Sequence, residues 1–202
     1  MMLNKDFLNR KEKAINSLEK AKNESKADEK ILPILNILNN SEEYFTSSSC
    51  SGRIVLLEIP EIGDKKNAKF LGIWHRCIEF DEIITASKKA KKGQIWLLAQ
   101  SPIIHIVSAN LQAADKIIKI ANASGFKNSG IKSINKKIMC EICSTERLDA
   151  PVGRNRNLFC DKEYLQLLVN ISNDIIDRST KKLLRLEQKL KKYLSTHKTT
   201  NQ

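Results

Sequence analysis

The sequence has few aromatic residues and no long apolar run. Aromatic residues make up 5% of the 202 residues, which argues against a protein that binds single-stranded nucleic acid mainly by stacking on aromatic rings. No stretch approaches the ~20 consecutive apolar residues that a membrane-spanning helix needs, and the first residues show no apolar signal region. We therefore expect a folded, soluble, cytoplasmic protein with no membrane partner.

The usual nucleotide-binding loops are also absent. No Gly-x-Gly-x-x-Gly sequence follows a predicted strand, and no phosphate-binding loop sequence occurs. These absences argue against a dehydrogenase, a kinase or a methyltransferase of the Rossmann type.

The five cysteines are an odd number, which argues against a disulfide framework. Cys140 and Cys143 have the spacing of zinc and redox sites, but no second pair of ligands stands at a suitable distance for zinc. The pair also lies in a strand-like run, where its side chains point to opposite faces. We therefore expect reduced thiols, a structural role for this pair and no metal.

Positive charge is in excess. The formal net charge is +12, which favours polyanions such as nucleic acid, acidic lipid or phosphorylated ligands. The alternative is that lysine-rich helix faces are simply solvated. Basic residues gather in the C-terminal half of a helix predicted over residues 161–196, namely Lys181, Lys182, Arg185, Lys189, Lys191 and Lys192.

The hydrophobic pattern predicts a mixed α/β fold. Apolar residues at helical spacing predict helices over residues 6–22, 31–38, 81–91 and 110–124. They also predict one long helix or two over residues 161–196. Short apolar runs predict strands over residues 53–59, 69–74, 95–98, 103–107 and 137–143. We expect one compact domain, with a catalytic core in residues 1–160 and a basic C-terminal helix in residues 161–202.

Two further sequence features bear on the expected fold. Asp28 stands where it can cap the second helix by accepting from free backbone amides. The sequences Ser51-Gly52-Arg53 and Ser129-Gly130-Ile131 each precede a strand, which leaves open a duplicated α/β unit.

The run Thr46-Ser47-Ser48-Ser49-Cys50-Ser51-Gly52-Arg53 is a dense cluster of small polar groups at the entrance to a strand. Gly52 permits backbone angles or close approaches that a side chain forbids. Arg53 offers a planar fork of donors that suits phosphate or carboxylate. A turn needs fewer such residues, so the run predicts a ligand-binding site.

Two histidines and one helix start are further candidates. His75 follows Trp74 and is either a general base or a polar residue at a strand end. His105 lies in the apolar run Ile103–Val107 and is either functional or a satisfied core residue. Ser108 or Asn110 caps the helix that follows, and the free amides of such a helix start can also hold an anion.

The segment from Tyr44 to Arg53 resembles the signature of the wybutosine-synthesising tRNA methyltransferase family, the third in its pathway. That signature is serine or threonine, any residue, Ser-Ser-Cys, any residue, Gly-Arg. Further similar blocks lie at residues 70–75, 100–111, 125–131 and 146–151, and Asp28 precedes the second helix as in the family. The resemblance extends from about Phe7 to Leu186. Thr46 supplies the threonine form of the first signature position, whereas Cys140 and Cys143 do not resemble family positions.

The resemblance implies an S-adenosylmethionine-dependent methyltransferase with a mixed α/β fold that differs from the Rossmann type. The implied substrate is N4 of the tricyclic wyosine base at position 37 of tRNA(Phe), either with an aminocarboxypropyl arm or as its simpler precursor. The anticodon loop of tRNA(Phe) is then the partner. A non-catalytic RNA-binding protein remains the alternative, although it leaves the serine-cysteine-arginine run unexplained. A helix-tail adaptor fits only the last forty or so residues.

The resemblance and the chemistry of methyl transfer together suggest roles for particular residues. His75 is the first candidate for the general base and Asp28 the second. The substrate- and cofactor-binding residues are expected to be Thr46, Ser48, Ser49, Cys50, Gly52, Arg53, Trp74, His105, Ser108, Asn110, Ser129 and Gly130. Lys181, Lys182, Arg185 and Lys189 are expected to contact the tRNA backbone.

Overall fold

A computed structural model describes residues 5–198, with side chains described through Ser195. The described residues form two compact units. Unit 1 contains residues 5–51, 102–145 and 180–198, and unit 2 contains residues 52–101 and 146–179. Each unit has one antiparallel sheet, and we describe each unit by itself.

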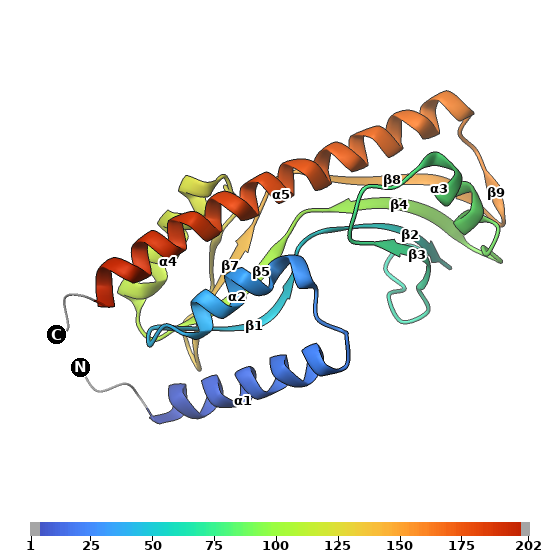
Figure 1. Ribbon diagram of the computed structural model, residues 1–202. Coiled ribbons are helices and arrows are strands. Elements are labelled where there is room, and N and C mark those ends of the chain that lie inside the picture. Colours follow the sequence, from blue (N-terminus) through green and yellow to red (C-terminus); the bar gives the residue numbers. More distant parts are fainter. Residues whose placement is uncertain (1–4, 199–202) are drawn as a thin grey trace. The chain divides into compact units, whose positions relative to one another are not determined.

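Unit 1 is a four-stranded sheet with strand order β1-β5-β7-β6. Its elements are α1 (Lys5–Asn23), η1 (Glu29–Ile31), α2 (Leu32–Asn39), β1 (Tyr44–Cys50), β5 (Ile103–Ser108), α4 (Leu111–Ser124), β6 (Gly130–Ser133), β7 (Ile138–Cys143) and the C-terminal half of α5 (Lys162–Lys198). Figure 1 shows α1 and α2 on opposite sides of β1.

The core of unit 1 follows from alternation along the strands. Ile104 and Ile106 point to one face, where α2, α4 and α5 supply the other apolar side chains. Helix α5 contributes a seam of residues three and four apart, Leu183, Leu186 and Leu190, as expected for one packed helix face. On the other face, Phe7 of α1 packs edge-on against Phe45 with ring centroids 5.1 Å apart.

Unit 2 is a five-stranded sheet with strand order β3-β2-β4-β8-β9. Its elements are β2 (Arg53–Ile59), β3 (Lys69–Trp74), α3 (Phe80–Ser87), β4 (Gln94–Gln100), β8 (Arg147–Arg154), β9 (Asn157–Leu158) and the N-terminal half of α5. Ile54 and Leu56 of β2 share a core with residues of α3 and α5. Asn173 of α5 exchanges two hydrogen bonds with the backbone of Ile78, at 2.8 and 2.9 Å, and so attaches α5 to the segment before α3.

The expected fold class is confirmed: the described residues form a mixed α/β fold with a long C-terminal helix, and both of their sheets are antiparallel, unlike the sheet of the Rossmann type. The strands predicted at residues 53–59 and 69–74 match β2 and β3. The last helix is one continuous element from Lys162 to Lys198. Residues 199–202, which complete the predicted C-terminal segment, lie outside the described part of the chain.

Three local expectations differ from the structure. The polar run after Phe45 is largely a strand, because pairing with β5 satisfies its backbone groups. Helix α3 ends at Ser87 rather than near residue 91. Asp28 stands at the N-cap position of η1, but its side chain makes no cap bond and instead accepts from the Ser51 amide at 2.7 Å. The cap prediction for Asp28 is therefore wrong.

None of the described helices combines the length and apolar character that crossing a membrane requires.

Helix α3 begins with a reciprocal cap that depends on a charged pair. Glu82 accepts from the Glu79 amide at 3.0 Å and receives two bonds from the Arg76 guanidinium at 2.7 and 2.9 Å. These bonds, with Arg76 the largest contributor, lower the pKa of Glu82 to about 2. The stabilising effect of ionised Glu82 is therefore present above its ordinary pKa near 4.5 and is lost as the pH falls toward 2.

We predict that Arg76→Gln raises the pKa of Glu82 toward 4.5, because the variant removes the largest cause of the shift. Carbon-13 NMR titration of the glutamate carboxyl groups measures this change. Lys69→Gln on β3 is the control, since it removes one exposed charge of the same unit. A titration of Glu82 that is the same in the wild type and Arg76→Gln would contradict the assignment.

Candidate active site

A row of four residues, which we call the polar row, crosses the whole sheet of unit 1. It consists of Ser48 on β1, His105 on β5, Glu141 on β7 and Gly130 on β6. Three of these residues are among those expected to bind ligand, and Glu141 connects them.

A bulge in β1 makes the first contact of the polar row possible. Thr46 pairs with Ile106 and Ser49 pairs with Ile104, so two residues of β1 stand opposite His105 alone. An inserted residue bends a strand and redirects its side chains, and bulges are enriched beside active sites. In this way Ser48 reaches the His105 ring.

Hydrogen bonds hold the polar row together. The Ser48 hydroxyl lies 2.7 Å from His105 Nδ1, and Glu141 Oε2 lies 2.9 Å from His105 Nε2. The second oxygen of Glu141 pairs with Lys132 Nζ at 2.7 Å. The bond from Lys132, followed by that from His105, lowers the pKa of Glu141 against the opposing effect of burial. Glu141 is therefore an ionised hydrogen-bond acceptor at neutral pH.

Thr46, Ser49 and Ser108 face the core side of the same sheet. Thr46 is buried, and both its amide and its hydroxyl bond to Asn39 Oδ1, at 2.8 and 3.2 Å. Ser49 Oγ is buried and has no hydrogen-bond partner among the described residues. Ser108 is buried beside the Cys140 sulfur, at 3.8 Å. These residues pack on the core side of β1 and β5. The Ser49 hydroxyl makes no hydrogen bond to another described residue.

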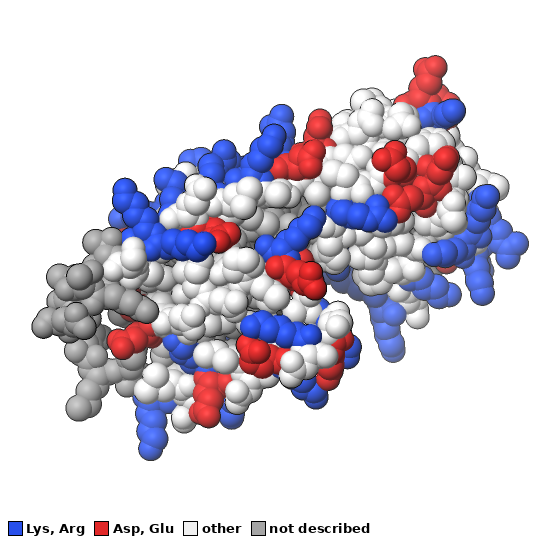
Figure 2. Space-filling view, viewed as in Figure 1, with Lys and Arg blue, Asp and Glu red and all other residues white. Residues whose placement is uncertain are grey.

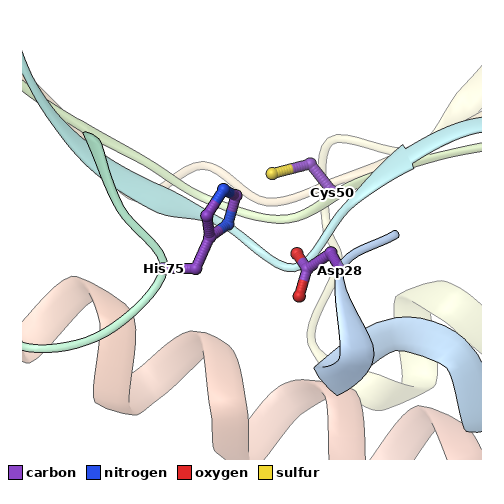
Figure 3. A group of neighbouring side chains, drawn as sticks. All are labelled: Asp28, Cys50 and His75. Carbon is purple, nitrogen blue, oxygen red and sulfur yellow. The ribbon is translucent and has the colours of Figure 1, made fainter. Parts of the chain in front are cut away.

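Asp28 and Cys50 meet at the other end of β1. The Asp28 carboxylate accepts from the Ser51 amide at 2.7 Å, and its oxygen lies within 4.8 Å of the Cys50 sulfur. Figure 3 shows Asp28 just before η1 and Cys50 at the end of β1. Both groups can serve as metal ligands or line a polar site.

The two cysteines of β7 face opposite sides of the strand, as expected. Cys140 is buried, which raises its pKa, and Cys143 points to the opposite face.

The remaining candidates of unit 1 lie elsewhere on the sheet. Asn110 caps α4 as predicted, accepting from the Ala113 amide at 2.8 Å. Ser129 bonds to the Phe126 carbonyl at 2.7 Å and supports the turn before β6. Because Cys50 pairs with the first residue of β5 and α4 follows its last, Asn110 and Cys50 lie at opposite ends of this strand pair. Five strand steps of about 3.4 Å separate those ends.

Unit 2 holds the second candidate group, around the start of β2. His75, which follows β3 and is labelled in Figure 3, lies with Nδ1 3.1 Å from the Gly52 carbonyl oxygen. A carbonyl only accepts, so Nδ1 carries the proton, and the basic nitrogen of the neutral ring is Nε2. Gly52 has φ of +98°, a conformation that favours glycine.

Arg53 is held in place before any ligand binds. Its Nε donates to Gln100 Oε1 at 2.7 Å, and its guanidinium carbon lies 5.8 Å from the centre of the Phe70 ring. This arrangement orients the fork of donors and reduces the entropy lost on binding an anion.

Trp74 is packed against its own strand. A Cβ atom at Gly72 would lie 2.1 Å from the Trp74 ring, so only glycine leaves room for the ring there. Trp74 also lines a surface pocket of unit 2 with Asp81, Glu82, Thr85, Ala86 and Lys89. Its position is therefore set by packing, directly before His75.

The four basic residues expected to contact tRNA divide into two pairs. Lys182 donates to the Ser144 hydroxyl at 2.6 Å, and Arg185 donates to the Ser124 carbonyl at 3.3 Å. Lys181 and Lys189 are exposed, as is Arg185. Figure 2 shows lysine and arginine side chains gathered over the C-terminal half of α5, interspersed with acidic groups.

Glu141, Lys132 and Gln100 are polar partners that the sequence analysis did not single out. Glu141 lies between two cysteines that drew attention only as a possible metal pair. Its alternation with Cys140 and Ile142, both buried, was the available signal, since it places Glu141 on the same face as His105 once β5 and β7 are paired.

Comparison with known proteins shows that the protein is a tRNA methyltransferase. Residues 9–192 match the family described as methyltransferase TYW3. The match covers most of the chain, and the chain belongs to this family.

Named relatives and solved structures agree with this assignment. The chain is 47% identical over 191 residues to the Pyrococcus horikoshii protein named tRNA(Phe) 7-((3-amino-3-carboxypropyl)-4-demethylwyosine(37)-N(4))-methyltransferase 1, covering 94% of this chain and 97% of the relative. It is 38% identical over 186 residues to the Methanocaldococcus jannaschii protein, whose name is the same except for the final 1. This match covers 91% of this chain and 96% of the relative. The structure of PH1069 from Pyrococcus horikoshii superposes with a TM-score of 0.89 at 46% identity, covering 94% and 98%.

The family resemblance inferred from the signature is thereby confirmed. The methyl group that such an enzyme transfers comes from a methyl donor.

Proposed function

We propose that this protein transfers a methyl group from S-adenosylmethionine to N4 of 7-(3-amino-3-carboxypropyl)-4-demethylwyosine at position 37 of tRNA(Phe), in the cytoplasm. The observation that carries the proposal is the 47% identity to a relative of that name along 94% of this chain. The anticodon loop is then the part of the tRNA that reaches the site.

The residues present fit a donor of this chemistry. Its sulfonium makes the methyl group electrophilic, so the protein mainly needs to bind and orient. Its amino and carboxylate groups need acceptors and donors. The exposed Ser48 hydroxyl is a group that can bind an amino group. The Arg53 guanidinium, oriented by Gln100, is a group that can bind a carboxylate. The amides at the start of α4, behind Asn110, are a further donor group for a carboxylate.

His75 is the residue we propose as general base. N4 loses a proton when it is methylated, and His75 Nε2 can hold that proton because Nδ1 is already committed to the Gly52 carbonyl. Asp28 is the second candidate, but its carboxylate already accepts a hydrogen bond from the Ser51 amide at 2.7 Å. Cys50 lines the site, since direct transfer from a sulfonium requires no protein nucleophile.

The proposal is tested with radiolabelled S-adenosylmethionine and tRNA(Phe) that carries the demethylwyosine base with its arm. We expect label in that base and none in tRNA(Phe) with guanosine at position 37. A parallel reaction with the precursor base that lacks the arm shows which intermediate is used. Label in neither modified tRNA contradicts the proposal.

The non-catalytic alternative rests on the exposed basic residues of α5. The same reaction decides between the two functions, because a binding protein retains the tRNA on a filter without transferring label. Filter binding and label transfer are therefore measured on the same samples.

We predict that Lys181→Glu with Lys189→Glu weakens tRNA binding and flattens its salt dependence, because both side chains are exposed. Loss of two phosphate contacts reduces the slope of log affinity against log salt by about 1.4–1.8. The matched control is Lys119→Glu, a lysine of unit 1 that pairs with Asp115 on α4. An unchanged salt slope in the double variant would show that α5 does not contact the tRNA.

A further inference from the structure

The polar row contains a residue that no motif of the signature includes. Glu141 uses one carboxylate oxygen on Lys132 and the other on His105. Its side chain is 18% exposed and that of His105 is 23% exposed, so both are partly shielded from water. Ser48 at the end of the row is exposed, and it is the member that a ligand reaches.

The chemistry of the three groups sets the direction of every hydrogen bond. An ionised carboxylate only accepts, so His105 Nε2 carries the proton that lies between it and Glu141. In the neutral ring Nδ1 is then an acceptor, and the Ser48 hydroxyl donates its proton to it. With that proton committed, the exposed Ser48 Oγ is left as a hydrogen-bond acceptor.

The other end of the row has room for a ligand. Gly130 pairs with Glu141 across β6 and β7, and a Cβ atom placed on Gly130 would meet nothing within 4 Å. The polar row thus has a hydrogen-bond acceptor, Ser48, at one end and unfilled space beside Gly130 at the other.

We propose that Glu141 is a positioning residue: it holds His105 in the Nε2–H tautomer, and through His105 it orients the Ser48 hydroxyl to accept a hydrogen bond from an N–H group of a bound ligand. This inference rests on the proposed function. Both the amino group of the methyl donor and the aminocarboxypropyl arm of the base provide such an N–H group.

The tautomer is tested first, on the protein alone. Nitrogen-15 NMR of the histidine rings, with His105 assigned by the variant His105→Gln, reports which ring nitrogen carries the proton. We expect the Nε2–H form in the wild type, a shift toward a mixture in Glu141→Ala, and retention in Glu141→Gln, whose amide oxygen still accepts. An unchanged tautomer in Glu141→Ala overturns the inference.

Ligand binding is tested with S-adenosylhomocysteine by calorimetry and with the modified tRNA by its KM. Loss of one oriented hydrogen bond weakens the affected ligand roughly 5- to 100-fold. Weaker S-adenosylhomocysteine binding in Glu141→Ala assigns the N–H group to the donor, and a raised tRNA KM alone assigns it to the base. If neither the S-adenosylhomocysteine affinity nor the tRNA KM changes in Glu141→Ala, the role proposed for Ser48 is overturned.

Glu187→Gln is the matched control. Glu187 also belongs to unit 1, pairs with a lysine at 2.6 Å, and its side chain is 20% exposed, but it lies on α5 outside the polar row. We expect Glu187→Gln to leave the His105 tautomer and the affinity for S-adenosylhomocysteine unchanged. If the wild type transfers no label yet shows the expected tautomer and its loss in Glu141→Ala, the proposed function fails while the positioning role stands.

Discussion

Replacing His75 with asparagine is expected to lower kcat for methyl transfer by roughly 100- to 10,000-fold, the contribution that a positioned general base typically makes. The asparagine amide can still donate to the Gly52 carbonyl, as Nδ1 of His75 does at 3.1 Å. It has no basic nitrogen, so the proton lost from N4 has no acceptor at this position. Single-turnover label transfer measures the rate of the chemical step directly.

His75→Gln extends the test, because its amide nitrogen reaches about as far as Nε2 and is equally non-basic. We expect both variants to be slow while their thermal stability stays close to that of the wild type. An asparagine variant that keeps more than about one tenth of the wild-type rate would exclude His75 as the base, because the expected loss is at least ~100-fold.

The largest expected effect on stability is at Leu186. This side chain is 0% exposed and lies in the core of unit 1, between Leu183 and Leu190 of the α5 seam. Leu186→Ala removes buried methyl groups and leaves a cavity, which costs about 2–5 kcal/mol of unfolding free energy. Denaturant unfolding followed by circular dichroism measures the difference.

Leu184→Ala is the control on the same helix. Leu184 is 54% exposed, so the same substitution there should change the unfolding free energy by less than about 0.5 kcal/mol. Equal losses at the two positions would mean that the cost arises in the helix itself and not from packing of α5 on the sheet of unit 1.

The regular elements with a strong apolar pattern were predictable from the sequence. Residues 53–59 contain a short apolar run rich in β-branched residues and form β2 within the same bounds. Asn110 and Gly125 bracket α4 as N-cap and left-handed C-cap, because side-chain acceptors at helix starts and glycine at helix ends satisfy local backbone requirements. These signals depend only on residues that are neighbours along the chain, so they can be recognised without knowledge of the fold.

Strand β1 illustrates what local pattern misses. Its serine run has a turn-like composition, yet pairing with β5 makes it a strand, since tertiary context overrides weak β propensity. Asp28 shows the same limit, because the Ser51 amide that its carboxylate accepts from lies 23 residues further along the chain.

The sequence by itself determined the family, through the serine-cysteine-arginine signature, and the local elements, through periodicity and caps. Only the tertiary structure decided which polar groups act together. The bulge that turns Ser48 to His105, and the strand pairing that sets Glu141 beside that ring, depend on contacts between residues 36 and 57 positions apart. Such contacts leave no periodic trace in the chain, because strand register is set by packing across the whole sheet.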